Sequence, residues 1–165
     1  MLRFVVLALA SALTLSAGCK SEPAPPAPKP PEAPPEKHIQ AVEPRDGSQE
    51  VTLTPTFKWK LPSALGAPRL ASFTLFEFGQ TAQPPKPDAE GRQIAFASGL
   101  HDVSPTSLDP FHPPAGVVLT GDLRDSKQLK GDTWYRWKIR ALGEDKTEQA
   151  GFLFRTRAAE PGQGK

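Results

Sequence analysis

Two stretches of the 165-residue chain alternate regularly between apolar and polar positions. In residues 51–61 the apolar positions are Val51, Leu53, Phe57, Trp59 and Leu61. In residues 133–141 they are Tyr135, Trp137, Ile139 and Ala141. A period of two over such a length is typical of a strand that buries one face. Both stretches are therefore predicted to be β-strands that contribute to a common core.

Four shorter apolar stretches are also predicted to be strands, and turn-forming residues separate them. They are residues 71–78, 92–98, 116–119 and 151–156. No stretch of comparable length has a helical period, although residues 122–129 would suffice for one short turn of helix. Several short strands without a long helix are typical of a β-sandwich. We therefore expect one all-β domain, an antiparallel β-sandwich of about seven strands.

The two ends of this domain resemble a known family. PRDGSQEVTLTPTFKWKL at residues 44–61, and LKGDTWYRWKIRA at residues 129–141 followed by FLFRT, are similar to bacterial fibronectin type III and related immunoglobulin-like domains. The resemblance covers about residues 38–157. It implies that Trp59 is a core residue of the second strand. It also implies a corner formed by Leu129, Gly131 and Tyr135, in which the tyrosine hydroxyl forms a hydrogen bond back across the corner.

The middle of the domain departs from this pattern. Residues 79–115 are rich in proline and longer than a compact sandwich needs between its third and fifth strands. Either they form an extended edge with one extra strand at residues 92–98, or they form a functional loop. Proline at an edge also prevents unwanted strand pairing.

The N-terminal residues are typical of an export signal. Arg3 precedes an apolar run at residues 4–15, which is too short for a membrane helix of about 20 residues. The following LSAGC resembles the lipobox of bacterial lipoproteins. The resemblance implies that residues 1–18 are removed and that Cys19, the only cysteine, becomes the lipidated first residue. The alternative is ordinary secretory cleavage, which would leave an unpaired thiol exposed to oxidation.

The lipoprotein resemblance also implies a location in the cell envelope. Two or three acyl chains would hold the protein stably on a membrane, and Lys20 after the cysteine favours the outer membrane in a cell that has one. Residues 21–37 contain eight prolines and no bulky apolar side chain. With Cys19 they are predicted to form a disordered, semi-rigid linker, or alternatively a PxxP ligand. The domain then spans residues 38–157, and residues 158–165 form a disordered tail.

The low net charge does not favour nucleic acid as a partner, whereas the strand pattern suggests an acidic partner. The formal charge is only +2 with both signs mixed along the chain, which does not favour nucleic-acid binding. If the strand at 133–141 pairs with those at 71–78 and 151–156, basic and exposed aromatic residues converge outside the core. They are Phe76, Phe78, Trp134, Arg136, Lys138, Arg140, Arg155 and Arg157. This surface is a candidate docking site for an acidic envelope protein, polysaccharide or lipid headgroup.

The alternative role for this surface is passive. Outward Arg and Lys side chains also keep a sheet soluble and protect its edges. In that case the protein would be a structural or accessory subunit of an envelope assembly.

Few residues are candidates for catalysis or metal binding. His101, Asp102 and His112, with Ser104 nearby, lack the spacing of a known metal or acid–base site. Two acidic clusters, Asp122 with Asp125, and Glu144 with Asp145 and Glu148, lack the ordered ligand spacing of a calcium loop. We therefore expect neither a cofactor nor an enzyme, and a metal-dependent enzyme using His101 and Asp102 is the third alternative.

Overall fold

The computed structural model describes residues 37–99 and 106–160. Within them the chain forms nine strands and two short 3-10 helices. The strands are β1 (Gln40–Glu43), β2 (Ser48–Val51), β3 (Phe57–Lys60), β4 (Arg69–Gly79), β5 (Arg92–Ser98), β6 (Ser107–Leu108), β7 (Leu119–Thr120), β8 (Trp134–Leu142) and β9 (Thr147–Thr156). The 3-10 helices are η1 (Ser63–Leu65) and η2 (Asp122–Arg124). The predicted signal peptide and Cys19 lie outside the described residues, as does the linker up to residue 36.

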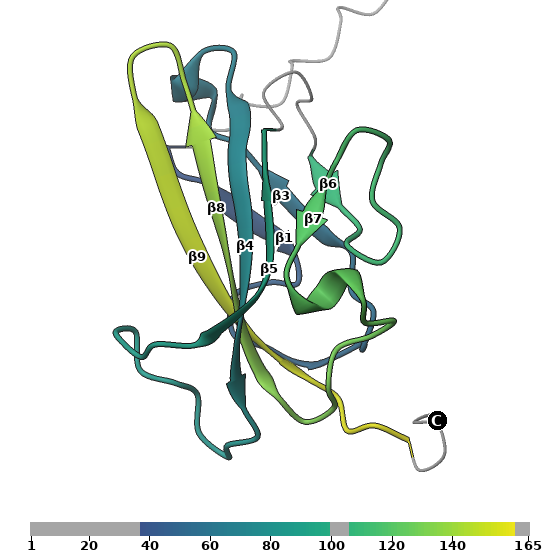
Figure 1. Cartoon of the computed structure of the whole chain (residues 1–165). Helices are drawn as coiled ribbons and strands as arrows, with labels where there is room; N and C mark the ends of the chain where they lie inside the picture. Colours follow the sequence, from purple (N-terminus) through teal and green to yellow (C-terminus); the bar gives the residue numbers. More distant parts are fainter. Residues whose placement is uncertain (1–36, 100–105, 161–165) are drawn as a thin grey trace, which may run out of the picture. The chain divides into compact units, whose positions relative to one another are not determined.

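The strands form two sheets that enclose a core, so the predicted β-sandwich is confirmed. The smaller sheet has the order β1-β3-β6, and the larger sheet has the order β2-β9-β8-β4-β5-β7. Figure 1 shows β9, β8, β4 and β5 side by side in the larger sheet. All pairings are antiparallel except that of β2 with β9, which is parallel.

Strand β8 lies inside the larger sheet and pairs along its length with β4 on one side and β9 on the other. Its inward residues, all fully buried, are Tyr135, Trp137, Ile139 and Ala141. The Trp137 ring packs against Phe57 and Trp59 of β3, with centroid separations of 5.4 and 6.4 Å. Aromatic pairs of this kind contribute about 0.5–1.5 kcal/mol beyond their buried area. The inward side chains of β8 therefore pack the two sheets together. Trp59 is a core residue, as expected.

The prediction of one continuous strand at residues 51–61 is wrong. Strand β2 ends at Val51 in the larger sheet, whereas β3 begins at Phe57 in the smaller sheet. Pro55 has no N–H to donate to a strand ladder, and the carbonyl of Leu53 accepts a hydrogen bond from a distant loop instead. The chain therefore crosses between the sheets here, while Leu53 and Phe57 remain buried.

The middle of the domain also differs in part from the expectation. The strand predicted at 116–119 is reduced to β7, because Gly116 has a φ of +86° and the Val117 N–H closes a turn. The expected short helical turn within residues 122–129 is η2. The extra strand expected at 92–98 is β5, which extends the larger sheet beyond β4.

Tyr135 closes the corner through which the chain enters β8. Its hydroxyl oxygen accepts a hydrogen bond from the Lys130 N–H at 3.0 Å, and its ring stacks on Phe154. Thr156 completes the corner, because its Oγ1 accepts from the Thr133 N–H at 3.0 Å and donates to the Lys130 carbonyl at 2.7 Å. These bonds satisfy backbone groups that would otherwise be buried without a partner.

Burial raises the pKa of Tyr135 to about 12 from an ordinary value of 10.0, and Tyr135 is the only tyrosine in the chain. Tyrosinate absorbance of the folded protein is therefore expected to appear near pH 12. The pKa of Tyr135 is higher in the folded state than in the unfolded state, so its neutral form contributes to the free energy of unfolding. This contribution is complete below pH 10 and is lost between pH 10 and 12. The free energy of unfolding of the wild type should fall by about 2 kcal/mol more over that range than that of Tyr135→Phe. A tyrosinate midpoint near pH 10 while the protein is still folded would contradict this account.

Candidate functional site

The register of the larger sheet brings together the outward side chains of β4, β8 and β9. Arg136 lies opposite Phe76 of β4, and Trp134 lies opposite Arg155 of β9. We call the outward surface of these three strands the outer face. Its predicted members are Phe76, Phe78, Trp134, Arg136, Lys138, Arg140 and Arg155. The remaining candidate, Arg157, lies just beyond the end of β9.

Two phenylalanine rings of the outer face lie close to cationic groups. Lys138 Nζ is 5.0 Å from the ring centroid of Phe76, and the guanidinium carbon of Arg136 is 4.9 Å from that of Phe78. Both rings are only partly exposed. At such sites a cation–π contact contributes about 0.5–1 kcal/mol. The rings and cations therefore form one layered surface.

Trp134 does not project into solvent, contrary to the expectation of an exposed aromatic side chain. It is only 3% exposed, because the loop after β4 and the side chain of Arg155 lie against it. Its Nε1–H donates a hydrogen bond to the Thr81 carbonyl at 3.0 Å. The Arg155 guanidinium is in turn paired with Asp132 at 2.7 Å. Trp134 and Arg155 therefore anchor neighbouring loops to the sheet.

Arg136 fixes the β4–β5 loop (residues 80–91) on the outer face. Its two terminal nitrogens donate hydrogen bonds to the carbonyls of Lys86 at 2.9 Å and Pro87 at 3.0 Å. A longer contact of 3.5 Å reaches the Ala89 carbonyl. The planar guanidinium fork suits several acceptors at once, whereas a lysine ammonium does not have this geometry. The charge of Arg136 is therefore largely engaged within the protein.

A hollow of about 490 Å³ lies between the β4–β5 loop and the sheet. The sheet contributes Phe76, Phe78, Arg136 and Lys138, and the loop contributes Pro87, Asp88, Ala89, Glu90 and Gly91. Gly91 allows the loop to approach the sheet closely, because a Cβ atom there would lie 2.8 Å from a ring atom of Phe78. The hollow thus has an aromatic floor, basic groups on one side and carboxylates on the other.

Two cations of the outer face, Lys138 and Arg140, form neither an ion pair nor a hydrogen bond with the described residues through their charged groups. Arg140 is exposed, and Lys138 contacts only the ring of Phe76 through its ammonium group. By contrast, the Arg157 guanidinium lies 4.0 Å from Glu160. Lys138 and Arg140 are therefore the cations of the outer face whose charged groups remain available to contact a ligand.

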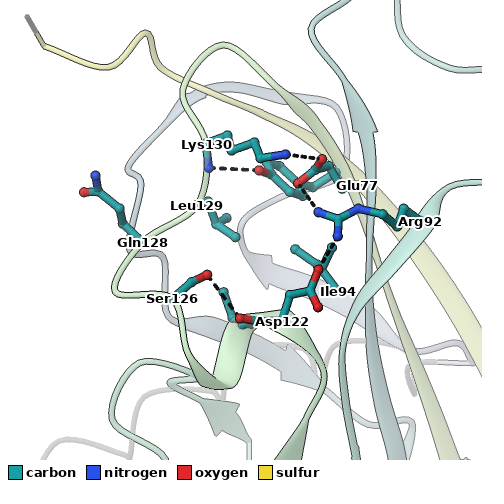
Figure 2. Close-up of a pocket in the computed structure, with 10 residues that line it drawn as sticks. Glu77, Arg92, Ile94, Asp122, Ser126, Gln128, Leu129 and Lys130 are labelled. Atoms are coloured by element: carbon teal, nitrogen blue, oxygen red, sulfur yellow. Dashed lines mark hydrogen bonds and ion pairs between the residues drawn. The ribbon is translucent and has the colours of Figure 1, made fainter. Parts of the chain in front are cut away.

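A second, smaller pocket of about 120 Å³ has Tyr135 among its lining residues. Figure 2 shows the charged side chains that line it. Its charges are paired with one another: Glu77 accepts from Lys130 Nζ at 2.7 Å and from Arg92 at 3.3 Å, and Arg92 also binds Asp122. The charge of Glu77 and the hydrogen bond to Asp122 raise the pKa of Arg92. Because these four charges neutralise each other, the pocket joins β4, β5, η2 and the loop before β8 rather than presenting groups to a ligand.

The residues considered for metal or acid–base chemistry are not brought together where the structure describes them. His112 is exposed and its Nδ1 lies 3.2 Å from Asp109, while His101, Asp102 and Ser104 lie outside the described residues. In the two acidic clusters, the carboxylates of Asp122 and Glu148 have partners elsewhere. Within residues 37–99 and 106–160, no three His, Cys, Asp or Glu side chains are grouped so that they could hold a metal ion.

The sequence matches no model of a known protein family, and no match was found among curated proteins. In the part of the chain that the structure describes, no helix is long and apolar enough to cross a membrane.

The loop residues Asp88, Glu90 and Gly91 were not among the residues predicted for this site. The available signal was the length of the β4–β5 connection, since most hairpin loops have two to five residues. Periodicity gives no information about the direction in which such a loop folds.

Replacing Arg136 with lysine should release the β4–β5 loop while preserving the charge. Loss of a hydrogen bond to a charged group costs about 1.5 kcal/mol, so amide hydrogen exchange at Ala89, whose N–H donates to the Lys86 carbonyl, should accelerate by about tenfold. Exchange within β8 should not change. Arg140→Lys is the matched control, because Arg140 makes no corresponding contact with described residues. Equal exchange in the two variants would show that Arg136 does not hold the loop.

Proposed function

We propose that the protein is a lipid-anchored, non-catalytic binding module of the cell envelope that engages an anionic envelope macromolecule through its outer face. The observation that supports this proposal best is the position of Lys138 and Arg140. Both cations lie on β8 and face the same side, and Lys138 lines a hollow with an aromatic floor. Aromatic residues and arginine are the side chains most often found at the centre of binding sites.

The fibronectin type III-like character of the domain is part of this proposal. Two features support it: the buried Trp59 of β3, and the hydrogen bond between the Tyr135 hydroxyl and the backbone before β8. Domains of this architecture present binding surfaces without requiring a disulfide, which agrees with a single cysteine at position 19.

Anchoring through Cys19 would keep the domain at a membrane surface. The apolar run before Cys19 and the proline-rich sequence after it support this assignment. Full-length protein with Cys19→Ser is expected to leave the membrane fraction and to lose incorporation of labelled palmitate. Retention of both properties by the variant would exclude lipidation at this residue.

A passive structural role is the second candidate. It is favoured by the internal contacts of Arg136 and Arg155, which hold loops on the sheet and leave fewer charges for a partner. Under this alternative the outer face would have no ligand, and the domain would act as an accessory subunit.

Charge reversal at the unengaged cations separates the two candidates. Immobilised mature chain, made soluble by Cys19→Ser, is incubated with solubilised envelope material at low and high salt. Lys138→Glu with Arg140→Glu should reduce partner retention by at least about tenfold, since cross-interface charge pairs contribute about 1.5 kcal/mol or more. Retention by wild type should decrease with salt.

The matched control reverses two lysines of β3 in the smaller sheet, Lys58→Glu with Lys60→Glu. Lys58 forms an exposed ion pair with Glu43, and such pairs contribute little to stability. The control should retain the partner. Equal loss in both double variants would contradict a role specific to the outer face. Absence of any retained partner with wild type would favour the passive role.

A further inference from the structure

The hollow on the outer face offers hydrogen-bond donors and acceptors around an aromatic floor. Lys138 supplies a cation on the sheet side, and Asp88 and Glu90 supply carboxylates on the loop side. Neither carboxylate forms an ion pair with a residue that the structure describes, and both side chains are exposed. Their oxygens are therefore available to accept hydrogen bonds from a ligand.

The presence of both a cation and carboxylates in the hollow favours one kind of anionic ligand over another. A stretch of acidic polypeptide would bring carboxylates to Lys138 but would be repelled by Asp88 and Glu90, because like charges at close range are unfavourable. A sugar acid carries a carboxylate together with several hydroxyl groups. Its hydroxyls can donate to Asp88 and Glu90, while its carboxylate accepts from Lys138.

The size and construction of the hollow also suit a compact ring. Its volume of about 490 Å³ lies in the range of about 300–1,000 Å³ that is usual for small-ligand sites. Arg136 fixes the loop, and Gly91 allows it to lie against Phe78, so the walls are held in place before a ligand arrives. A pre-formed site loses less conformational entropy on binding.

We propose that this hollow is a binding subsite for one carboxylate-bearing sugar unit of an acidic polysaccharide. The inference rests on the proposed function and specifies the class of its partner. Asp88 and Glu90 accept hydrogen bonds from sugar hydroxyls, and Lys138 binds the sugar carboxylate. Arg140, further along β8, binds the acid group of a neighbouring unit, which extends recognition along the polymer.

The test compares two polymers that share carboxylates and differ in hydroxyl groups, polygalacturonate and polyglutamate. Their affinities for the mature Cys19→Ser chain are measured by calorimetry at low salt. The diagnostic variant is Asp88→Ala with Glu90→Ala, and the control is Glu144→Ala with Asp145→Ala in the turn between β8 and β9. Both double variants remove two exposed negative charges, so they change the net charge equally.

Removal of the loop carboxylates is expected to change the affinities for the two polymers in opposite directions. Removal of Asp88 and Glu90 should weaken polygalacturonate binding by about tenfold, because lost hydrogen bonds outweigh the relief of repulsion. The control should bind polygalacturonate as tightly as the unmodified chain, or slightly more tightly. Polyglutamate should bind more weakly than polygalacturonate and should bind better when Asp88 and Glu90 are removed.

Two outcomes overturn the inference while leaving the proposed function in place. One is tighter binding of polygalacturonate by the Asp88→Ala, Glu90→Ala variant, which would mean that the carboxylates only repel. The other is that polygalacturonate binds no more tightly than polyglutamate, including the case in which neither binds, while retention of envelope material still requires Lys138 and Arg140. If neither polymer binds and envelope retention does not depend on those cations, the proposed function fails as well.

Discussion

Side chains of β8 point alternately into the core and outward, so the packing of the core also determines which residues lie on the outer face. Residues that point inward on this strand, including Trp137, join the two sheets, so the residues between them must point outward. A slip of one residue in register would exchange the two sets and bury a row of cations. The Tyr135 corner opposes such a slip, because its hydroxyl binds the backbone at Lys130. The position of the outer face is therefore a consequence of how the core is packed.

The cations of the outer face have two different functions. Arg136 and Arg155 bind groups of the protein itself and hold loops against the sheet. The charged groups of Lys138 and Arg140 form neither an ion pair nor a hydrogen bond with the described residues and give the face its available positive charge. This division explains how a chain with a formal charge of only +2 can still present a local basic surface.

Sequence periodicity was sufficient for the fold class and for most strands, because burial on one side determines which positions can be apolar. It failed at residues 51–61, where the alternation of burial continues although the strand does not: Pro55 interrupts the ladder while Leu53 stays inside. Seven of the eight residues predicted for the outer face lie on β4, β8 and β9, whereas Arg157 lies beyond the end of β9. Neither the burial of Trp134 nor the engagement of Arg136 was predicted. Burial of Trp134 and the engagement of Arg136 depend on a loop whose path has no periodic signal.

The central claim is that the outer face contacts envelope material. Photo-crosslinking in intact cells tests it most directly, with a photoactivatable amino acid at Thr74, which lies opposite Lys138 on β4 and leaves both cations in place. Position 58 in the smaller sheet is the control. The account predicts a crosslinked envelope adduct from position 74 that is absent or much weaker from position 58. No adduct from position 74, or equal adducts from both positions, would contradict it.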